Sequence, residues 1–183
     1  MVLAFSGWSL ETSMSTQTDF IDKIAPGAVE AFKKTGVFAS VTIAQAILES
    51  GWGKSALARQ AKNFFGIKCD GSWNGEVCTM LTREVVNGRS TIVKGEFRSY
   101  PNLSGSILDH AEFLKENKRY EKAFAAKDGP SFAKAIAKAG YATDPKYADF
   151  LVKLITQFKL EKYDNGDLPD IDPEVISKNE QMA

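Results

Sequence analysis

The stretch from Ser40 to Ser55 constrains the fold most, because it predicts a helix with one buried face and an acid on the other. Ser40 can accept hydrogen bonds from the free amides of a helix start, and the residues that follow it tolerate helix. The apolar side holds Ile43, Ala44, Ile47 and Leu48, and the opposite stripe holds Thr42, Gln45 and Glu49. Gly51 and Gly53, with Trp52 between them, end the helix directly after Glu49.

Glu49 lies on the predicted last turn of this helix. The negative end of the helix dipole and partial desolvation both raise the pKa of a carboxyl group in that position. A raised pKa is what a general acid needs near neutral pH. Position alone nevertheless favours a solvated residue at a helix end over a catalytic one.

The composition is that of one soluble globular domain, with 183 residues, 44% of them hydrophobic and 25% charged. Lys+Arg and Asp+Glu both number 23, so no net field attracts nucleic acid and we expect none as a partner. The apolar start, residues 1–5, is too short to span a bilayer and lacks the basic flank of a secretory signal. We expect a monomer with no membrane span and no signal peptide in this chain.

Two cysteines, Cys69 and Cys78, lie in one Gly-rich segment. A zinc site would need more ligands, and with His110 as the one histidine we expect no metal. A disulfide closing this short loop would suit a protein that works outside the cytoplasm, and two free thiols are the equal alternative. A lone histidine on a helix is more often packed or exposed than catalytic, so we assign no role to His110.

Between Trp73 and Tyr100 the apolar pattern changes from helical to extended, with Asn87-Gly88 in the middle. That dipeptide is the strongest short-range signal for a hairpin, because both residues accept positive φ. Further helices are predicted over residues 18–36, 104–117, 130–139 and 144–158. The sequence therefore predicts a mostly helical α+β protein with a small β-hairpin lobe.

Both ends of the chain are predicted to lie outside the folded domain. Residues 1–17 are rich in Ser and Thr without sustained periodicity, which is typical of a tail. After Tyr163 the sequence becomes acidic and contains proline, which is typical of a tail or linker. The predicted domain is therefore 18–163, with tails over 1–17 and 164–183.

Four ordered blocks resemble the glucosaminidase family of peptidoglycan hydrolases, which includes flagellar muramidase-type proteins and many autolysins. The blocks are residues 44–55, 63–68, 82–100 and 139–148. The resemblance implies a lysozyme-like helical body with a small β-lobe, and a substrate cleft between the two. It implies no metal or organic cofactor.

The resemblance also implies roles for individual residues. Glu49 would be the catalytic acid, and Glu84, within Thr82-Arg-Glu84, would be the second catalytic residue that a glycosidase of the usual kind needs. The alternative for Glu84 is an exposed strand residue paired with a nearby Arg or Lys. The expected substrate-binding residues are Trp52, Asn63, Phe64, Tyr141 and Tyr147, of which Asn63 would support the end of the catalytic helix. Arg98 could face either a carboxylate or the sugar chain.

By this resemblance the chain should cleave the β-1,4 bond between N-acetylglucosamine and N-acetylmuramic acid in glycan strands of peptidoglycan. It would act as an endo-β-N-acetylglucosaminidase, outside the cell or in the cell wall. Two alternatives stay open. One is a muramidase or lytic transglycosylase of lysozyme-like fold, and the other is a non-catalytic glycan-binding or phage structural module.

Overall fold

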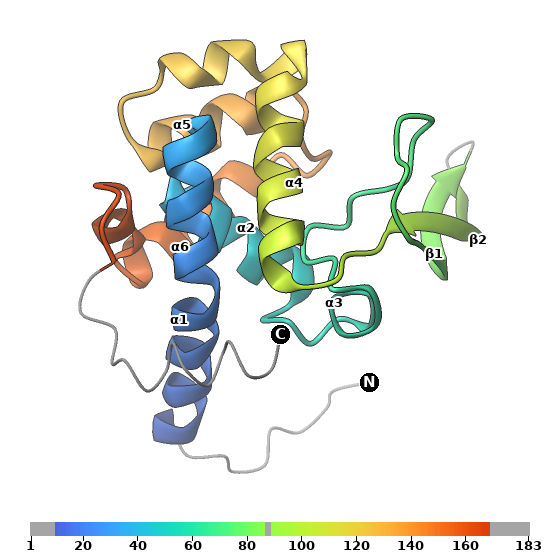
Figure 1. Cartoon of the computed structure of the whole chain (residues 1–183), viewed down its shortest axis with the longest axis horizontal. Helices are drawn as coiled ribbons and strands as arrows, with labels where there is room; N and C mark the ends of the chain where they lie inside the picture. Colours follow the sequence, from blue (N-terminus) through green and yellow to red (C-terminus); the bar gives the residue numbers. More distant parts are fainter. Residues whose placement is uncertain (1–9, 87–88, 169–183) are drawn as a thin grey trace.

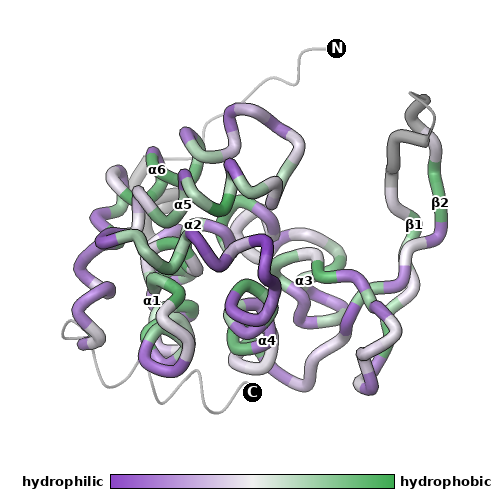
Figure 2. The backbone as a smooth tube through the Cα atoms, turned by 90° about the horizontal axis from the view of Figure 1, so that it is seen from above, coloured by the Kyte–Doolittle hydropathy of each residue, from purple (hydrophilic) through white to green (hydrophobic). Residues whose placement is uncertain are grey.

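The protein is mostly helical with one β-hairpin, as the sequence predicted. The structure, a computed structural model, describes residues 10–86 and 89–168, and the side chains of residues 16–82 and 91–168 within them. The elements are α1 (Leu10–Thr35), α2 (Ala39–Ser50), α3 (Ala56–Ala61), β1 (Val77–Val86), β2 (Arg89–Arg98), α4 (Leu103–Glu116), α5 (Gly129–Lys138) and α6 (Tyr147–Gln157), with 3-10 helices η1 (Lys118–Ala125) and η2 (Leu160–Tyr163). Two perpendicular views show the hairpin projecting from one side of the helical body (Figure 1, Figure 2).

Helix α2 is the core of the body. Its residues from Ala39 to Ile47 are all buried, and it contacts α1, α5, α6 and η2. A helix that is buried around its whole circumference belongs to a protein interior. The polar stripe that the sequence predicted is therefore inside the protein at Thr42 and Gln45, and it reaches solvent at Glu49.

The start of α2 is capped from the far end of the chain. Ser40, the predicted cap, lies inside the helix and makes no side-chain cap for it. Its backbone N–H and its hydroxyl donate instead to the two carboxylate oxygens of Asp164, at 2.8 and 2.7 Å. A carboxylate at a helix start satisfies a free amide and interacts favourably with the helix dipole. The prediction that Ser40 caps the helix was wrong, because a residue 124 positions away supplies the cap.

The structure describes residues on both sides of the predicted domain, 18–163, whose boundaries stay a prediction. Helix α1 begins at Leu10 rather than at Thr18, and it continues through Pro26 as one helix of 26 residues. At the other end, Gly166 is buried, and a Cβ built on it would lie 3.3 Å from the Lys33 side chain. Residues 1–9 and 169–183 lie outside the described residues.

The strands β1 and β2 pair antiparallel along their whole length, from Val77 opposite Arg98 to Val86 opposite Arg89. The predicted turn residues Asn87 and Gly88 lie outside the described residues. On its other edge β2 is bridged by Lys68, which lies opposite Phe97. This bridge joins the hairpin to the segment that follows α3.

Strand β2 separates the two cysteines. Cys78 lies opposite Phe97 on one edge of β2, whereas the Cys69 amide donates to the Glu96 carbonyl on the other edge at 3.0 Å. Two strand spacings place the two backbones about 10 Å apart, beyond the ~7 Å between Cα atoms that a disulfide can bridge. Both cysteines are free thiols. Of the two alternatives left by the sequence, the structure holds the free thiols.

Within the described residues, no helix is long and apolar enough to cross a bilayer. The same part of the chain contains no group of three or more His, Cys, Asp or Glu residues that could hold a metal ion.

We expect Asp164→Ala to lower the free energy of unfolding by ~1–2 kcal/mol, because α2 loses its cap. The measurement is urea denaturation at neutral pH. Asp167→Ala removes an exposed acid from the same segment and should change the free energy by no more than ~0.5 kcal/mol. Equal denaturation midpoints for the two variants would contradict the capping role.

Candidate active site

Glu49 lies where the buried helix α2 emerges into solvent. The helix ends at Ser50, and Gly51 takes the left-handed conformation, with φ 56°, that ends a helix and that glycine adopts without strain. Trp52 also has a positive φ of 60°, which is uncommon for a bulky residue. The tight turn leaves the Glu49 side chain exposed on the last turn, as the sequence predicted.

The surroundings of Glu49 shift its pKa in two directions. Its side chain is exposed, yet surrounding protein partly desolvates the carboxyl group, and this burial raises its pKa above the usual range. The Tyr147 hydroxyl donates to Glu49 Oε1 at 2.8 Å, which lowers the pKa and offsets part of the rise. Burial is the larger effect. The result is a carboxyl group that stays protonated at higher pH than usual and is open to a substrate.

Tyr147 is the first residue of α6 and is itself buried. Its hydroxyl oxygen accepts a hydrogen bond of 2.9 Å from Nε2 of Gln45, which lies one helical turn before Glu49 on α2. Burial raises the pKa of Tyr147, so the hydroxyl keeps its proton and can donate it to the carboxylate. The two helices are thus joined by a line of hydrogen bonds from Gln45 through Tyr147 to Glu49.

A second tyrosine, Tyr141, connects this group to a buried residue of α4. The Tyr141 ring, half-buried, stacks on Tyr147 with ring centres 5.5 Å apart. Its hydroxyl lies 3.3 Å from Nε2 of His110, whose ring stacks on Phe65 at 3.9 Å. Burial lowers the pKa of His110 to about 3, so the imidazole is neutral near pH 7.

Sequence reasoning assigned no role to His110. The signal that places it inside is its spacing with Ile107, Ala111 and Leu114, which are buried on the same face of α4. Gln45 has a similar signal, since it is four residues before Glu49 on one helix.

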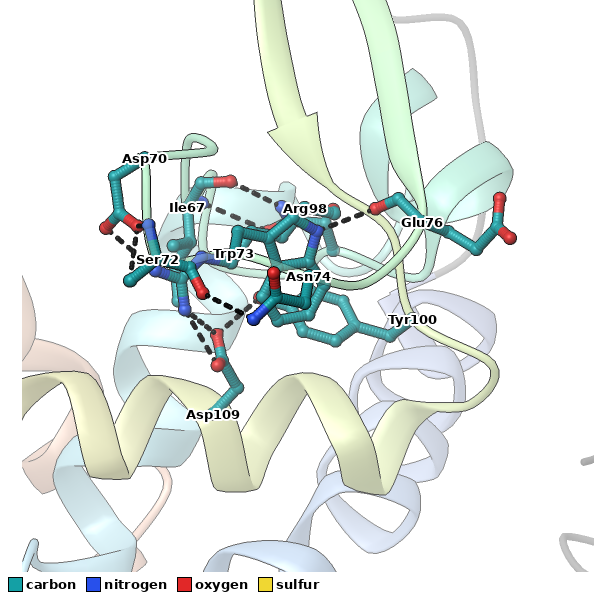
Figure 3. Close-up of polar contacts among 10 residues, drawn as sticks. Ile67, Asp70, Ser72, Trp73, Asn74, Glu76, Arg98, Tyr100 and Asp109 are labelled. Carbon is teal, nitrogen blue, oxygen red and sulfur yellow. Dashed lines mark hydrogen bonds and ion pairs between the residues drawn. The ribbon is translucent and has the colours of Figure 1, made fainter.

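Arg98 joins the hairpin to the helical body (Figure 3). Its Nη1 lies 2.8 and 3.1 Å from the two carboxylate oxygens of Asp109 on α4, and its Nη2 lies 3.0 Å from Asp70. The Tyr100 hydroxyl donates to the same Asp109 carboxylate at 2.7 Å. The guanidinium also lies 4.8 Å from the centre of the Trp73 ring. Of the two partners that the sequence left open for Arg98, the structure shows carboxylates.

The model of one protein family, described as mannosyl-glycoprotein endo-beta-N-acetylglucosaminidase, matches residues 25–160. The chain belongs to this glucosaminidase family. It is 38% identical over 163 residues to the exo-glucosaminidase LytG of Bacillus subtilis, an alignment that covers 85% of this chain and 57% of the relative. The chain spans about half the length of the curated relatives it matches.

Solved structures agree with the family assignment. The catalytic domain of the autolysin Auto from Listeria monocytogenes is 33% identical, with a TM-score of 0.73 over 87% of this chain and 100% of that one. A truncated glycoside hydrolase domain of FlgJ from Salmonella typhimurium is 37% identical, with a TM-score of 0.67 over 78% of this chain and 97% of that one. The predicted family, enzyme class and helical fold with a β-lobe are confirmed.

Three residues expected to bind substrate take part in packing. Trp52 makes edge-to-face contacts with Phe20 and Phe158, at ring-centre distances of 5.8 and 5.2 Å. Phe64 is buried against the same Phe20. Asn63 is also buried, and its amide donates to the carbonyls of Ile67 and Arg98 at 2.9 and 2.8 Å. Asn63 therefore supports the root of the hairpin.

Glu84 lies in β1, where its backbone pairs with Thr91 of β2. Its side chain is outside the part of the chain that the structure describes. The pairing of Glu84 with Glu49 as two catalytic residues stays a prediction.

Tyr147→Phe should raise the pKa of Glu49. The substitution removes the hydrogen bond that lowers this pKa and leaves the burial that raises it. The titration of 13C-labelled glutamate carboxyl groups by NMR measures the shift, and Glu49→Gln identifies the signal. Tyr163→Phe changes another buried tyrosine, one that faces Asp22, and should leave the Glu49 titration unmoved. A Glu49 pKa that falls in Tyr147→Phe would contradict this account.

Arg98→Lys should lower the free energy of unfolding by ~1–3 kcal/mol, because an ammonium group cannot bond both aspartates at once and the part-buried Asp109 carboxylate loses its contact with two oxygens. Urea denaturation gives the difference. Arg59→Lys, at an exposed position of α3, is the matched control and should stay within ~0.5 kcal/mol of the wild type. Equal stability of the Arg98 and Arg59 variants would show that the contacts with Asp109 and Asp70 do not hold the hairpin in place.

Proposed function

We propose that this glucosaminidase domain hydrolyses the β-1,4 bond between N-acetylglucosamine and N-acetylmuramic acid in peptidoglycan and leaves N-acetylglucosamine at the new reducing end. The observation that carries the proposal is Glu49, an exposed carboxyl group with a raised pKa at the end of the core helix. The proposed substrate of the domain is the glycan strands of the bacterial cell wall, outside the cytoplasm. Cleavage within strands, rather than from their ends, is part of the proposal.

Glu49 acts as the general acid. In its protonated form it gives its proton to the glycosidic oxygen while the bond between that oxygen and the anomeric carbon breaks. A water molecule then supplies the hydroxyl group of the new reducing end. Burial raises the pKa of Glu49 and so keeps more of it protonated near neutral pH, which supports this role.

Glu84 is the second carboxylate in this proposal, as base for the water or as stabiliser of the oxocarbenium-like transition state. Its place on β1 supports the role, since the hairpin forms the lobe beside the helical body (Figure 1). The substrate's own N-acetyl group is the alternative partner, and Glu84 would then matter less. The anomeric configuration of early products tests this choice, since a β-product would rule out simple inversion with Glu84 as the base.

Tyr141 is the residue proposed to contact a sugar ring. The Tyr141 side chain is half-buried, and its ring stacks on the ring of Tyr147. A tyrosine in this position offers an apolar face for a pyranose ring and a hydroxyl group for a polar contact.

Glu49→Gln should reduce wall hydrolysis by at least ~10²-fold, because the variant lacks the acid proton. A zymogram on bacterial walls, combined with mass spectrometry of the soluble products, measures both rate and bond specificity. Reducing-end N-acetylglucosamine in fragments of varied length supports an endo-glucosaminidase. Products released only from strand ends would instead match the exo-activity in the name of LytG.

Other products would overturn the proposal. Reducing N-acetylmuramic acid would identify a muramidase, and 1,6-anhydro ends would identify a lytic transglycosylase. A Glu49→Gln variant with unchanged function would identify a non-catalytic glycan-binding module. Glu84→Gln belongs in the same experiment, with Glu96→Gln, an exposed glutamate on the other strand of the hairpin, as its control.

A further inference from the structure

A buried amide is bonded to the same hydroxyl group as Glu49. Gln45 is fully buried, and its Nε2 lies 2.9 Å from the hydroxyl oxygen of Tyr147. The same hydroxyl lies 2.8 Å from Oε1 of Glu49, across 98 residues of sequence. Two residues of α2 therefore meet on one hydroxyl group of α6.

The chemistry of these groups determines which atom donates and which accepts in the two hydrogen bonds. An amide nitrogen donates and does not accept, so the Tyr147 oxygen accepts from Gln45. The single hydroxyl proton is then left for Glu49. If the amide were turned so that Oε1 faced Tyr147, the hydroxyl would donate to Gln45 instead. It would then accept from protonated Glu49, and the acid proton would point into the protein.

We propose that Gln45 is a positioning residue for the glucosaminidase reaction. Because Gln45 donates to Tyr147, the Tyr147 hydroxyl donates to Glu49 Oε1. The acid proton of Glu49 is then carried by Oε2, the oxygen that faces the glycosidic bond. Among the described residues no hydrogen bond to Oε2 competes with this use. The proposal rests on the proposed role of Glu49 as the acid.

The other end of the amide indicates that Gln45 is not there for stability alone. Gln45 Oε1 is buried and has no hydrogen-bond partner among the described residues. An unpaired buried acceptor destabilises a folded protein, and an apolar residue of the same volume would avoid that cost. The neighbours of Gln45 along α2, Ala44 and Ala46, are apolar and fully buried. A polar residue kept there at a cost in stability is what a functional position shows.

The groups around this line do not themselves titrate near neutral pH. Burial raises the pKa of Tyr141, in the α5–α6 connection, and of Tyr147, the first residue of α6. Burial lowers the pKa of His110, on α4, to about 3. Among the groups on this line, the carboxyl group of Glu49 is therefore the one whose titration we expect to shape the alkaline side of the activity profile.

The test uses Gln45→Met, which keeps the volume and removes the donor, and Gln45→Asn, which keeps the amide but is one methylene too short to reach Tyr147. We expect kcat on solubilised glycan strands to fall about tenfold in both, with KM changed less than about twofold. The alkaline limb of kcat/KM should move to higher pH. The reason is that Tyr147 without Gln45 is a weaker donor and stabilises the Glu49 carboxylate less.

Two comparisons separate positioning from packing. Thr42→Val removes another fully buried polar group one turn earlier on α2, whose hydroxyl donates to the Phe38 carbonyl at 3.3 Å, and should leave kcat and the pH profile as in the wild type. Combining Gln45→Met with Tyr147→Phe should be no worse than Tyr147→Phe alone, because Gln45 acts through that hydroxyl.

Several outcomes would overturn the proposal. They are wild-type kcat with an unmoved alkaline limb in folded Gln45 variants, additive effects with Tyr147→Phe, or failure of both Gln45 variants to fold. The last outcome would assign Gln45 to the core alone. If Glu49→Gln keeps its activity, the assignment of the acid fails instead, whatever the Gln45 variants show.

Discussion

The burial of helix α2 is the constraint on which the rest of the structure depends. The helix is enclosed from Ala39 to Ile47, so its position is determined by packing on several sides. Glu49 is carried at the end that leaves this enclosure. A carboxyl group on a helix held so firmly has little freedom to move, and its distance to a bound glycan is then a property of the whole core.

A carboxyl group lies at each end of α2, and its interaction with the helix dipole is favourable at the start and unfavourable at the end. At the start, the carboxylate of Asp164 receives the Ser40 amide and hydroxyl, and Gly129 of α5 packs so closely there that a Cβ would collide with the Ser40 hydroxyl. At the end, a carboxyl group meets the unfavourable pole of the helix dipole and is partly desolvated. The first arrangement stabilises the fold. The second raises the free energy of the charged acid, which is useful for proton donation and costs stability.

Local patterns were enough to predict the Glu49 helix, its end at the glycines, and the hairpin around Asn87-Gly88. Each of these is encoded by residues close together in sequence. The contacts that define the candidate site join residues far apart in the sequence. Asp164 caps α2 from 124 positions away, and Tyr147 reaches Glu49 across 98. The sequence could name Tyr147 only through the family resemblance, and its contact with Glu49 required the folded chain.

The hairpin shows how the two parts of the domain depend on one another. Arg98 connects the hairpin to Asp109 of α4, and His110, the next residue, connects α4 to Tyr141. The root of the hairpin and the aromatic group beside Glu49 therefore share one turn of α4. A change in the tilt of α4 would move both at once, because neighbouring residues on one helix cannot shift independently. If Glu84 works with Glu49, the separation of the two carboxyl groups is set through this turn, and with it the stereochemical course of hydrolysis.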